Sequence, residues 1–295
     1  MKKIIYWLGG VLVLLGLVTG QVYASDEKKV VLQISPVKQD LELEAGKTYH
    51  GYFFVQNVGD LKFSYEVSVT PYSVVNENYD PDYVRESSQT QITKWVTFEQ
   101  TTGELLPGDM HKINYIINVP SNAPGGGQYA ALMAETADSG QEGATLQTIS
   151  RVGMLLYASV EGETIKEGEV MDLKIDKLLL NPPLAFSALV KNTGNVDFNT
   201  TMRMEVVNAL TGEVVYDNWD NPEERIVLPE TSRLSVLEWT EAPKLGVFKV
   251  RAEASALGDT QSLEQVILAC PLWLILMGCF WIVLGVMLLV LRKRK

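Results

Sequence analysis

Short runs that alternate between hydrophobic and polar residues recur from residue 49 to residue 253. In KINYIINV at 112–119, Ile113, Tyr115, Ile117 and Val119 share one face. Alternation with a period of two is typical of half-buried antiparallel strands. Turn clusters such as NVGD, TTGE, LPGD and NTGN separate the runs, and no long helical pattern precedes residue 266. The pattern predicts an all-β protein.

The alternating part of the chain also repeats itself. VQNVGDLKF at 55–63 aligns with VKNTGNVDF at 190–198, and LLPGD at 105–109 aligns with VLPET at 227–231. The matches come in the same order, so we infer two copies of one β-domain. Each Asn-x-Gly is expected to be a tight turn in which glycine supplies a positive φ.

Each copy holds about seven short strands separated by turn signals, which is typical of an immunoglobulin-like sandwich. We therefore expect two tandem immunoglobulin-like β-sandwich domains, at residues 25–160 and 161–265. The polar stretch EGETIKEGEV at 161–170 marks the boundary. TADSGQEGATLQ at 136–147 has the composition of a loop, and we expect it to be a hairpin tip within the first domain.

Both ends of the chain are hydrophobic. Lys2 and Lys3 precede an apolar stretch and VYA at 22–24, which predicts a signal peptide at 1–24; an uncleaved anchor is the alternative. Residues 266–291 carry no charge and precede the basic residues 292–295. This pattern predicts a single transmembrane helix with a cytoplasmic tail, and hence a cell-membrane protein whose N-terminal part lies outside.

The part between the two ends is strongly acidic. It holds 36 acidic and 19 basic residues, a formal net charge of −17. Such a surface disfavours nucleic acid and other polyanions as partners, and leaves cationic partners or neutral sugars. Cys270 and Cys279 both fall in the predicted span, so the exported part has no disulfide, a pattern that favours a Gram-positive type of bacterium.

Residues for catalysis are scarce. The two histidines, His50 and His111, lie in strand patterns, and the sequence has no G-x-S-x-G, HExxH or phosphate-binding loop. APGGGQY at 123–129 is rich in glycine but lacks a lysine, so it is expected to be a turn. We therefore expect a protein without enzymatic activity and without a cofactor.

The loop NENYDPDY at 76–83 is the one candidate metal site. Its alternating oxygen ligands could hold calcium, although Pro81 and Ser87 stand where an EF-hand requires glycine and glutamate. An irregular calcium site and a plain solvated loop both stay open. The candidate calcium ligands are Asn76, Asn78, Asp80 and Asp82.

The same loop is rich in tyrosine. Exposed aromatic side chains on loops of a rigid sandwich can stack on sugars or anchor a protein partner. The alternative is that the tyrosines cap the end of the sandwich, whereas Trp95 is expected in the core. The candidate ligand-binding residues are Tyr72, Tyr79, Asp80, Asp82, Tyr83 and Trp219.

LPETS at 228–232 differs at one position from Leu-Pro-x-Thr-Gly, the signal for covalent attachment to a cell wall. Such a signal lies directly before the hydrophobic segment, but residues 233–265 intervene here. VLPET also occupies the place that LLPGD holds in the first copy. The segment is therefore expected to be a turn before a strand.

The chain resembles the WxL-interacting proteins of Gram-positive bacteria. The similarity lies in ISPVKQDLELEAGKTYHGYFFVQN at 34–57, in the run at 105–132 that begins with LLPGD, and in ISRVGMLLYASVEG at 149–162. The resemblance implies that the first domain binds peptidoglycan and that the second, nearer the membrane, binds a host. It implies no individual binding residue.

These features predict a membrane-anchored binding or scaffold protein that holds peptidoglycan or a WxL-type surface protein. One alternative is an adhesin that presents its domains to host matrix proteins. Another is an extracytoplasmic assembly chaperone that acts by β-strand addition. A wall hydrolase is disfavoured because no catalytic set is present.

Overall fold

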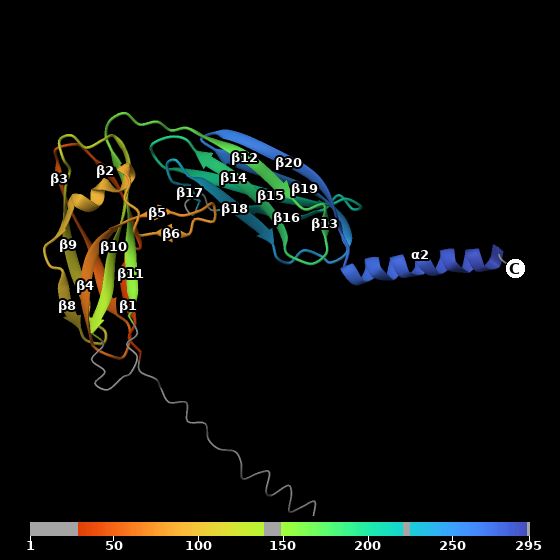
Figure 1. Cartoon of the computed structure of the whole chain (residues 1–295), viewed down its shortest axis with the longest axis horizontal. Helices are drawn as coiled ribbons and strands as arrows, with labels where there is room; N and C mark the ends of the chain where they lie inside the picture. The colour runs from red at the N-terminus through yellow and green to blue at the C-terminus, as the bar shows by residue number, and fades with distance from the viewer. Residues whose placement is uncertain (1–28, 139–148, 221–224, 294–295) are drawn as a thin grey trace, which may run out of the picture.

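The structure, a computed structural model, describes residues 29–138, 149–220 and 225–293. It consists of β-strands, a short 3-10 helix and one long C-terminal helix (Figure 1). The expected signal peptide at 1–24 and most of the expected hairpin tip lie outside the described residues. The two strands that flank the tip pair antiparallel, as expected.

Residues 32–160 form two sheets that we call the N-terminal sandwich. One sheet has the strand order β1-β3-β9-β7 and the other β2-β11-β10-β4-β8. The strands are β1 (Leu32–Ser35), β2 (Lys38–Leu43), β3 (Thr48–Asn57), β4 (Phe63–Pro71), β7 (Val96–Phe98), β8 (Thr102–Leu105), β9 (Met110–Asn118), β10 (Gly126–Asp138) and β11 (Arg151–Val160). A small hairpin of β5 (Ser73–Val74) and β6 (Pro81–Asp82) and the 3-10 helix η1 (Ser88–Lys94) interrupt them.

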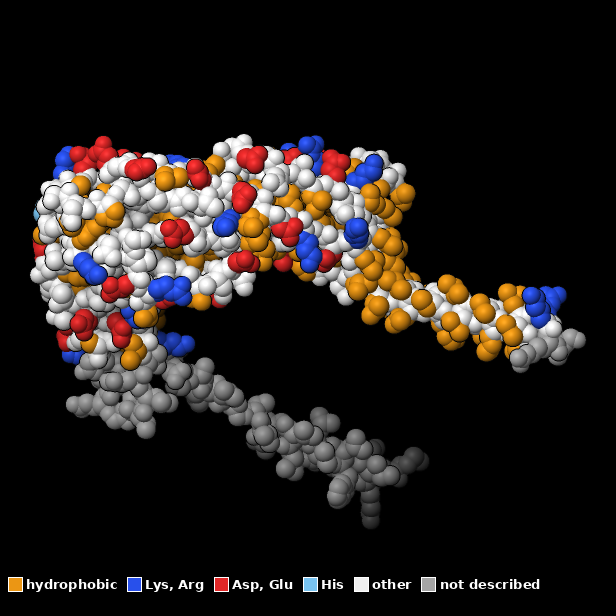
Figure 2. Space-filling view, turned by 45° about the horizontal axis from the view of Figure 1, so that its top comes forward, with side chains coloured by type: hydrophobic (Ala, Val, Ile, Leu, Met, Phe, Trp, Pro, Cys, Tyr) orange, Lys and Arg blue, Asp and Glu red, His pale blue; other side chains and the backbone are white. Residues whose placement is uncertain are grey.

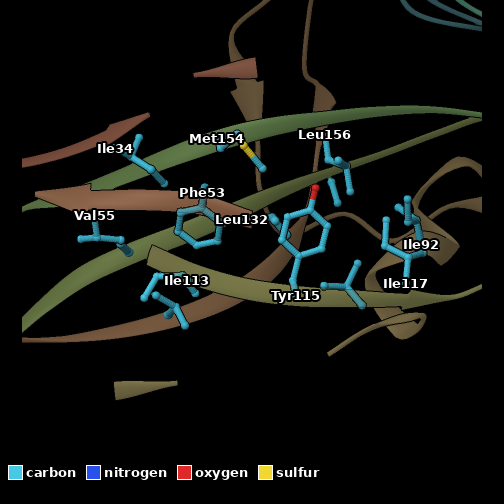
Figure 3. Packing of buried hydrophobic residues seen from close by; sticks show 14 of the residues in the cluster. Ile34, Phe53, Val55, Ile92, Ile113, Tyr115, Ile117, Leu132, Met154 and Leu156 are labelled. Atoms are coloured by element: carbon cyan, nitrogen blue, oxygen red, sulfur yellow. The ribbon is translucent and has the colours of Figure 1, made fainter. Parts of the chain in front are cut away.

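The core of this sandwich is built from the predicted inward-facing positions. Tyr115 and Ile117 on β9 are buried, and they meet Phe53 on β3 and Leu132 on β10 (Figure 3). Trp95 is also buried in this core, as expected. Gly51 lies under the ring of Tyr115, whose hydroxyl donates a hydrogen bond to Gln39 on β2 at 2.7 Å. That contact joins the two sheets.

Residues 168–269 form a second pair of sheets, the C-terminal sandwich, with its own core. The smaller sheet has the order β12-β14-β18 and the larger β13-β20-β19-β15-β16, with β17 also paired to β15. The strands are β12 (Gly168–Ile175), β13 (Leu178–Leu179), β14 (Leu184–Asn192), β15 (Phe198–Asn208), β16 (Val214–Trp219), β17 (Ile226–Val227), β18 (Ser232–Trp239), β19 (Gly246–Ala256) and β20 (Asp259–Ala269).

The two sandwiches have corresponding topologies. In each, the first strand pairs antiparallel with the third, and the second runs parallel to the last: β2 beside β11, and β13 beside β20. This arrangement is an immunoglobulin-type β-sandwich, which confirms the expected fold class. Division into two independently folding domains stays a prediction.

The repeat seen in the sequence is a repeat of contacts. Asn57 is fully buried; its amide nitrogen donates to the carbonyls of Leu61 and Leu105, and its oxygen accepts from the Gly59 N–H. Asn192 is equally buried; its amide nitrogen donates to the carbonyls of Val196 and Val227, and its oxygen accepts from the Gly194 N–H. Each of these three partners stands at the position that aligns with a partner of Asn57 in the first copy. The asparagine therefore closes the loop after the strand in both copies.

The expected reason for the glycine in this motif is wrong. Neither Gly59 nor Gly194 has a positive φ. A Cβ on Gly59 would lie 2.3 Å from the Lys29 carbonyl oxygen, and one on Gly194 would lie 2.1 Å from that of Ile165. Glycine is required because an earlier backbone segment passes directly over it, not because of the turn conformation.

The C-terminal helix α2 (Leu272–Lys293) is the one helix among the described residues that is long and apolar enough to cross a membrane. Its mean hydropathy is 2.9, and at about 1.5 Å per residue its length matches the hydrocarbon thickness of a bilayer. The expected start at Val266 is wrong, because β20 continues through Ala269. Pro271 precedes the first helical residue, and its carbonyl accepts from the Leu274 N–H.

Candidate functional site

The tyrosine-rich loop of the N-terminal sandwich packs against the C-terminal sandwich. Tyr72, Tyr129 and Tyr157 are buried together with Ile226 and Leu228, which come from the other half of the chain. Tyr79 and Tyr83, which the sequence places on an open loop, pack against the same group. We call this cluster the tyrosine interface.

Tyr79 makes the most specific contacts in the tyrosine interface. Its hydroxyl accepts a hydrogen bond from the Leu228 N–H at 2.7 Å and lies 2.8 Å from the Thr231 hydroxyl. The Arg233 guanidinium lies 4.4 Å from the centre of its ring. Tyr79 has a φ of +65°, which is uncommon for a bulky residue, and this backbone conformation aims the side chain at residues 228–231.

These contacts explain the LPETS segment. In the first copy, the Asp109 carboxylate accepts from the Leu106 N–H and so caps the turn from within. In the second copy Thr231 occupies that position, and its hydroxyl instead donates to the Leu228 carbonyl. The Leu228 N–H is capped by Tyr79 from the other sandwich. LPETS is thus a turn, as expected, and it serves as the docking point of the tyrosine loop.

Further hydrogen bonds cross between the two sandwiches. The Tyr129 hydroxyl donates to the Asp197 carboxylate at 2.7 Å, and the Gly127 N–H donates to the Asn195 carbonyl at 2.7 Å. The Leu234 N–H on β18 donates to the Glu77 carbonyl at 2.8 Å. Burial raises the pKa of Tyr79, and it also raises the pKa of Tyr129 and Tyr157 well above the usual range. The interface therefore favours the neutral form of these three tyrosines.

High pH is expected to destabilise the folded chain. Because the folded state raises the pKa of Tyr79, Tyr129 and Tyr157, their contribution to stability is complete below the unfolded pKa of about 10 and declines as the pH rises further. Tyr115, with a pKa of about 12, adds to the decline. Urea unfolding at about pH 8 and about pH 11 should show a lower midpoint at the higher pH. An unchanged midpoint would contradict this prediction.

The candidate calcium ligands are engaged within their own loop. The Asn76 side-chain oxygen accepts from the Asn78 N–H, and the Asn76 amide donates to Asp80. Asp82 accepts from the N–H groups of Val84 and Arg85, which lowers the pKa of its carboxyl. Within the part of the chain that the structure describes, no group of three or more His, Cys, Asp and Glu residues could hold a metal. Calcium binding stays a prediction.

The remaining candidate residues lie apart from the loop. Trp219 is 60% exposed on β16 and stacks under Arg203, whose guanidinium lies 4.9 Å from the ring centre. The structure does not bring it together with the tyrosines. His50 and His111 lie on β3 and β9, where they pair with Ile116 and Val55, well apart along the ladder.

With the loop engaged, the sheet edges are the remaining places where a partner can bind through backbone groups. The edge of β18 is largely used. Besides Leu234, the Val236 carbonyl accepts from the Arg225 side chain and the Glu238 carbonyl accepts from the Tyr216 hydroxyl. Side chains and the β5–β6 loop therefore cover this edge.

The edge of β20 is different. β20 pairs with β19 over its whole length, but on its other side β13 pairs only with Leu268 and Ala269. The Leu268 N–H points to β13 and bonds to the Lys177 carbonyl, so the even-numbered residues direct their backbone groups away from β19. Residues 259–267 have no strand partner on that side among the described residues. We call them the open edge.

The open edge is suited to pairing with another strand. Its even-numbered positions Thr260, Ser262 and Glu264 are exposed, while Leu263 packs against the core. The side-chain amide of Gln261 donates to the Val170 carbonyl on β12 and so links the edge strand to the facing sheet. An uncovered row of N–H and C=O groups is a template for an added strand.

No family model matches the chain, and no curated protein matches it. Solved structures with a related arrangement include the class 5 fimbriae chaperone CfaA, at 12% identity and a TM-score of 0.39, covering 81% of this chain and 99% of that one. The E. coli chaperone DraB gives 11% identity and a TM-score of 0.37 over 80% of this chain and 97% of that one. The Pseudomonas aeruginosa chaperone CupB2 gives 10% identity and a TM-score of 0.35, over 79% and 99%.

These comparisons correct several expectations. These three structures are chaperones and not WxL-interacting proteins, and no family model supports the latter family. The expected membership in that family is wrong, and so are the expected partners, which were peptidoglycan, WxL-type proteins and host matrix proteins. Nothing found supports the expected Gram-positive origin. All three of these proteins are named as chaperones, and a chaperone is one of the alternatives expected from the sequence.

Proposed function

We propose that this chain is a membrane-anchored, extracytoplasmic assembly chaperone without enzymatic activity, and that it binds an extended segment of an exported protein by β-strand addition. The observation that carries the proposal is the open edge of β20, where residues 259–267 present backbone groups that no described strand uses. Main-chain hydrogen bonds would supply the affinity, so the site accepts segments of different sequence.

The charge and anchoring of the chain agree with this role. The acidic surface disfavours polyanions and keeps the exported part soluble. We propose that α2 crosses the membrane once, that Arg292 and Lys293 lie on the cytoplasmic side, and that the two sandwiches are separate domains outside. Only Cys270 and Pro271 separate β20 from α2, so a captured segment would be held close to the membrane where exported chains emerge.

Replacing Ser262 with proline is expected to weaken binding about tenfold. The Ser262 N–H points to the open edge, so proline removes a donor to the partner without breaking the ladder to β19. The expected tenfold loss corresponds to one backbone hydrogen bond between Ser262 and the added strand, together with the steric bulk of the proline ring at the edge. The measurement is site-specific photo-crosslinking of the full chain in membranes to exported proteins, followed by affinity measurement with a captured segment.

The matched control is Ser262→Ala, which keeps the N–H and is expected to bind like the wild-type chain. Equal loss in both variants would mean that the side chain, and not the backbone edge, makes the contact. Crosslinks that persist unchanged in Ser262→Pro would rule out strand addition at β20.

A further inference from the structure

Exposed leucines gather at the end of the C-terminal sandwich from which α2 leaves. They come from β13, from the turn after β15, from the turn before β19 and from the end of β20. We call them the leucine rim: Leu178 (43% exposed), Leu210 (84%), Leu245 (65%) and Leu268 (48%). Figure 2 shows hydrophobic side chains gathered where this sandwich meets α2.

Strand pairing places the rim at one end. Leu268 pairs with Leu178 on one side and with Val247 on the other. Gly246 pairs with Ala269, which sets Leu245 beside the start of the connection to α2. That connection is only two residues long, Cys270 and Pro271, so the rim lies at the end of the sandwich where the helix begins.

The outer face of the larger sheet changes in character away from α2. In the row next to Leu268, Val266 pairs with Lys249, which pairs with Val207. In the row after that, Glu264 pairs with Arg251, which pairs with Glu205, and Arg251 lies 4.0 Å from Glu264. Along β20, β19 and β15, the apolar residues of this face lie in the part nearest the helix.

We infer that the leucine rim lies in the interfacial layer of the lipid bilayer, so that the C-terminal sandwich rests on the membrane surface instead of standing away from it. The occupant is lipid because the rim is continuous with the start of α2, and this inference rests on the proposed membrane anchor. Buried leucine side chains supply the binding energy. Lys177, Lys244 and Lys249 lie at the same end, and their long side chains can reach anionic headgroups.

The test uses the full chain in nanodiscs with lipids that carry a nitroxide quencher near the headgroup. An environment-sensitive fluorophore is attached to Leu210→Cys or Leu245→Cys in a chain that also carries Cys270→Ser and Cys279→Ser. The matched control is Leu106→Cys, a 51% exposed leucine of the N-terminal sandwich. Quenching is expected at residues 210 and 245 and not at residue 106.

A probe on native Cys279 within α2, in a Cys270→Ser chain and with lipids that carry the nitroxide in the acyl chain, separates the two proposals. Quenching at Cys279 with none at residues 210 and 245 would overturn the rim's contact with lipid while the anchor stands. No quenching at Cys279 would overturn the anchor itself. A blue-shifted but unquenched probe at residues 210 and 245 would show that a protein covers the rim, which also overturns the inference.

Discussion

Replacing Asn192 with alanine is expected to lower the free energy of unfolding by about 3 kcal/mol or more. The side chain is fully buried and satisfies the carbonyls of Val196 and Val227 and the Gly194 N–H. Alanine removes the donor to both carbonyls and leaves the Gly194 N–H with only the Glu167 carbonyl as acceptor, and each buried group left unsatisfied costs about 1–3 kcal/mol. Denaturant unfolding of the full chain in detergent measures the change.

Asn57→Ala should have a similar effect, because Asn57 makes the same three contacts in the N-terminal sandwich. The matched control is Asn114→Ala, whose amide bonds to Glu99 at an exposed site and whose loss should change stability by less than about 0.5 kcal/mol. A small effect at Asn192 or Asn57, comparable to that at Asn114, would refute the structural role of the repeated asparagine.

Replacing Tyr79 with phenylalanine is expected to weaken the contact between the two sandwiches by about 1–3 kcal/mol, because the Leu228 N–H loses its acceptor. Phenylalanine keeps the ring under Arg233, so the change isolates the hydroxyl. Hydrogen exchange should become faster at Leu228 and at Leu234, whose amide bonds to the same loop, while amides in the two cores keep their protection.

Tyr52→Phe is the control, since Tyr52 is 49% exposed on β3 and lies outside the tyrosine interface. Tyr79→Phe exchange rates equal to those of Tyr52→Phe would show that the hydroxyl does not hold the sandwiches together. Faster exchange throughout the C-terminal core would show instead that Tyr79 supports that core and not the contact.

The sandwich fold could be predicted because burial of one face requires hydrophobic residues at every second position of a strand. Ile113 and Ile117 are buried residues that follow this alternation. The repeat could be predicted because Asn57 and Asn192 make the same hydrogen bonds, and these bonds require the same residue types in both copies. The role of the glycines could not, since the backbone that passes over Gly59 comes from residues 29–31, and local sequence does not show such a neighbour.

The destination of the tyrosine loop could not be predicted for a related reason. Tyr79 reads as an exposed loop residue until the surface of the second sandwich is known. The one available signal was the difference between the copies: Asp109 caps its own turn, and Thr231 at the matching place does not. A missing internal cap is a reason to look for an external one.

The start of α2 was misplaced because VILA at 266–269 is apolar and uncharged, like the span that follows. Hydropathy does not distinguish a strand end from a helix start. The repeat held the necessary information: the last strand of the first copy, β11, needs a counterpart, and SLEQVILA is the segment that supplies it. The open edge was missed for the same reason, since the last four of the eleven residues of its strand were assigned to the membrane.

The direct passage from β20 into α2 has a mechanical consequence. If α2 is anchored as proposed, tension on it enters the sandwich along β20, and the ladder to β19, paired from residue 259 to residue 269, carries the load in shear. A segment added to the open edge would place a second ladder in parallel with the first. A bound segment would then strengthen the connection between the C-terminal sandwich and α2, and the connection would resist force best while a segment is bound.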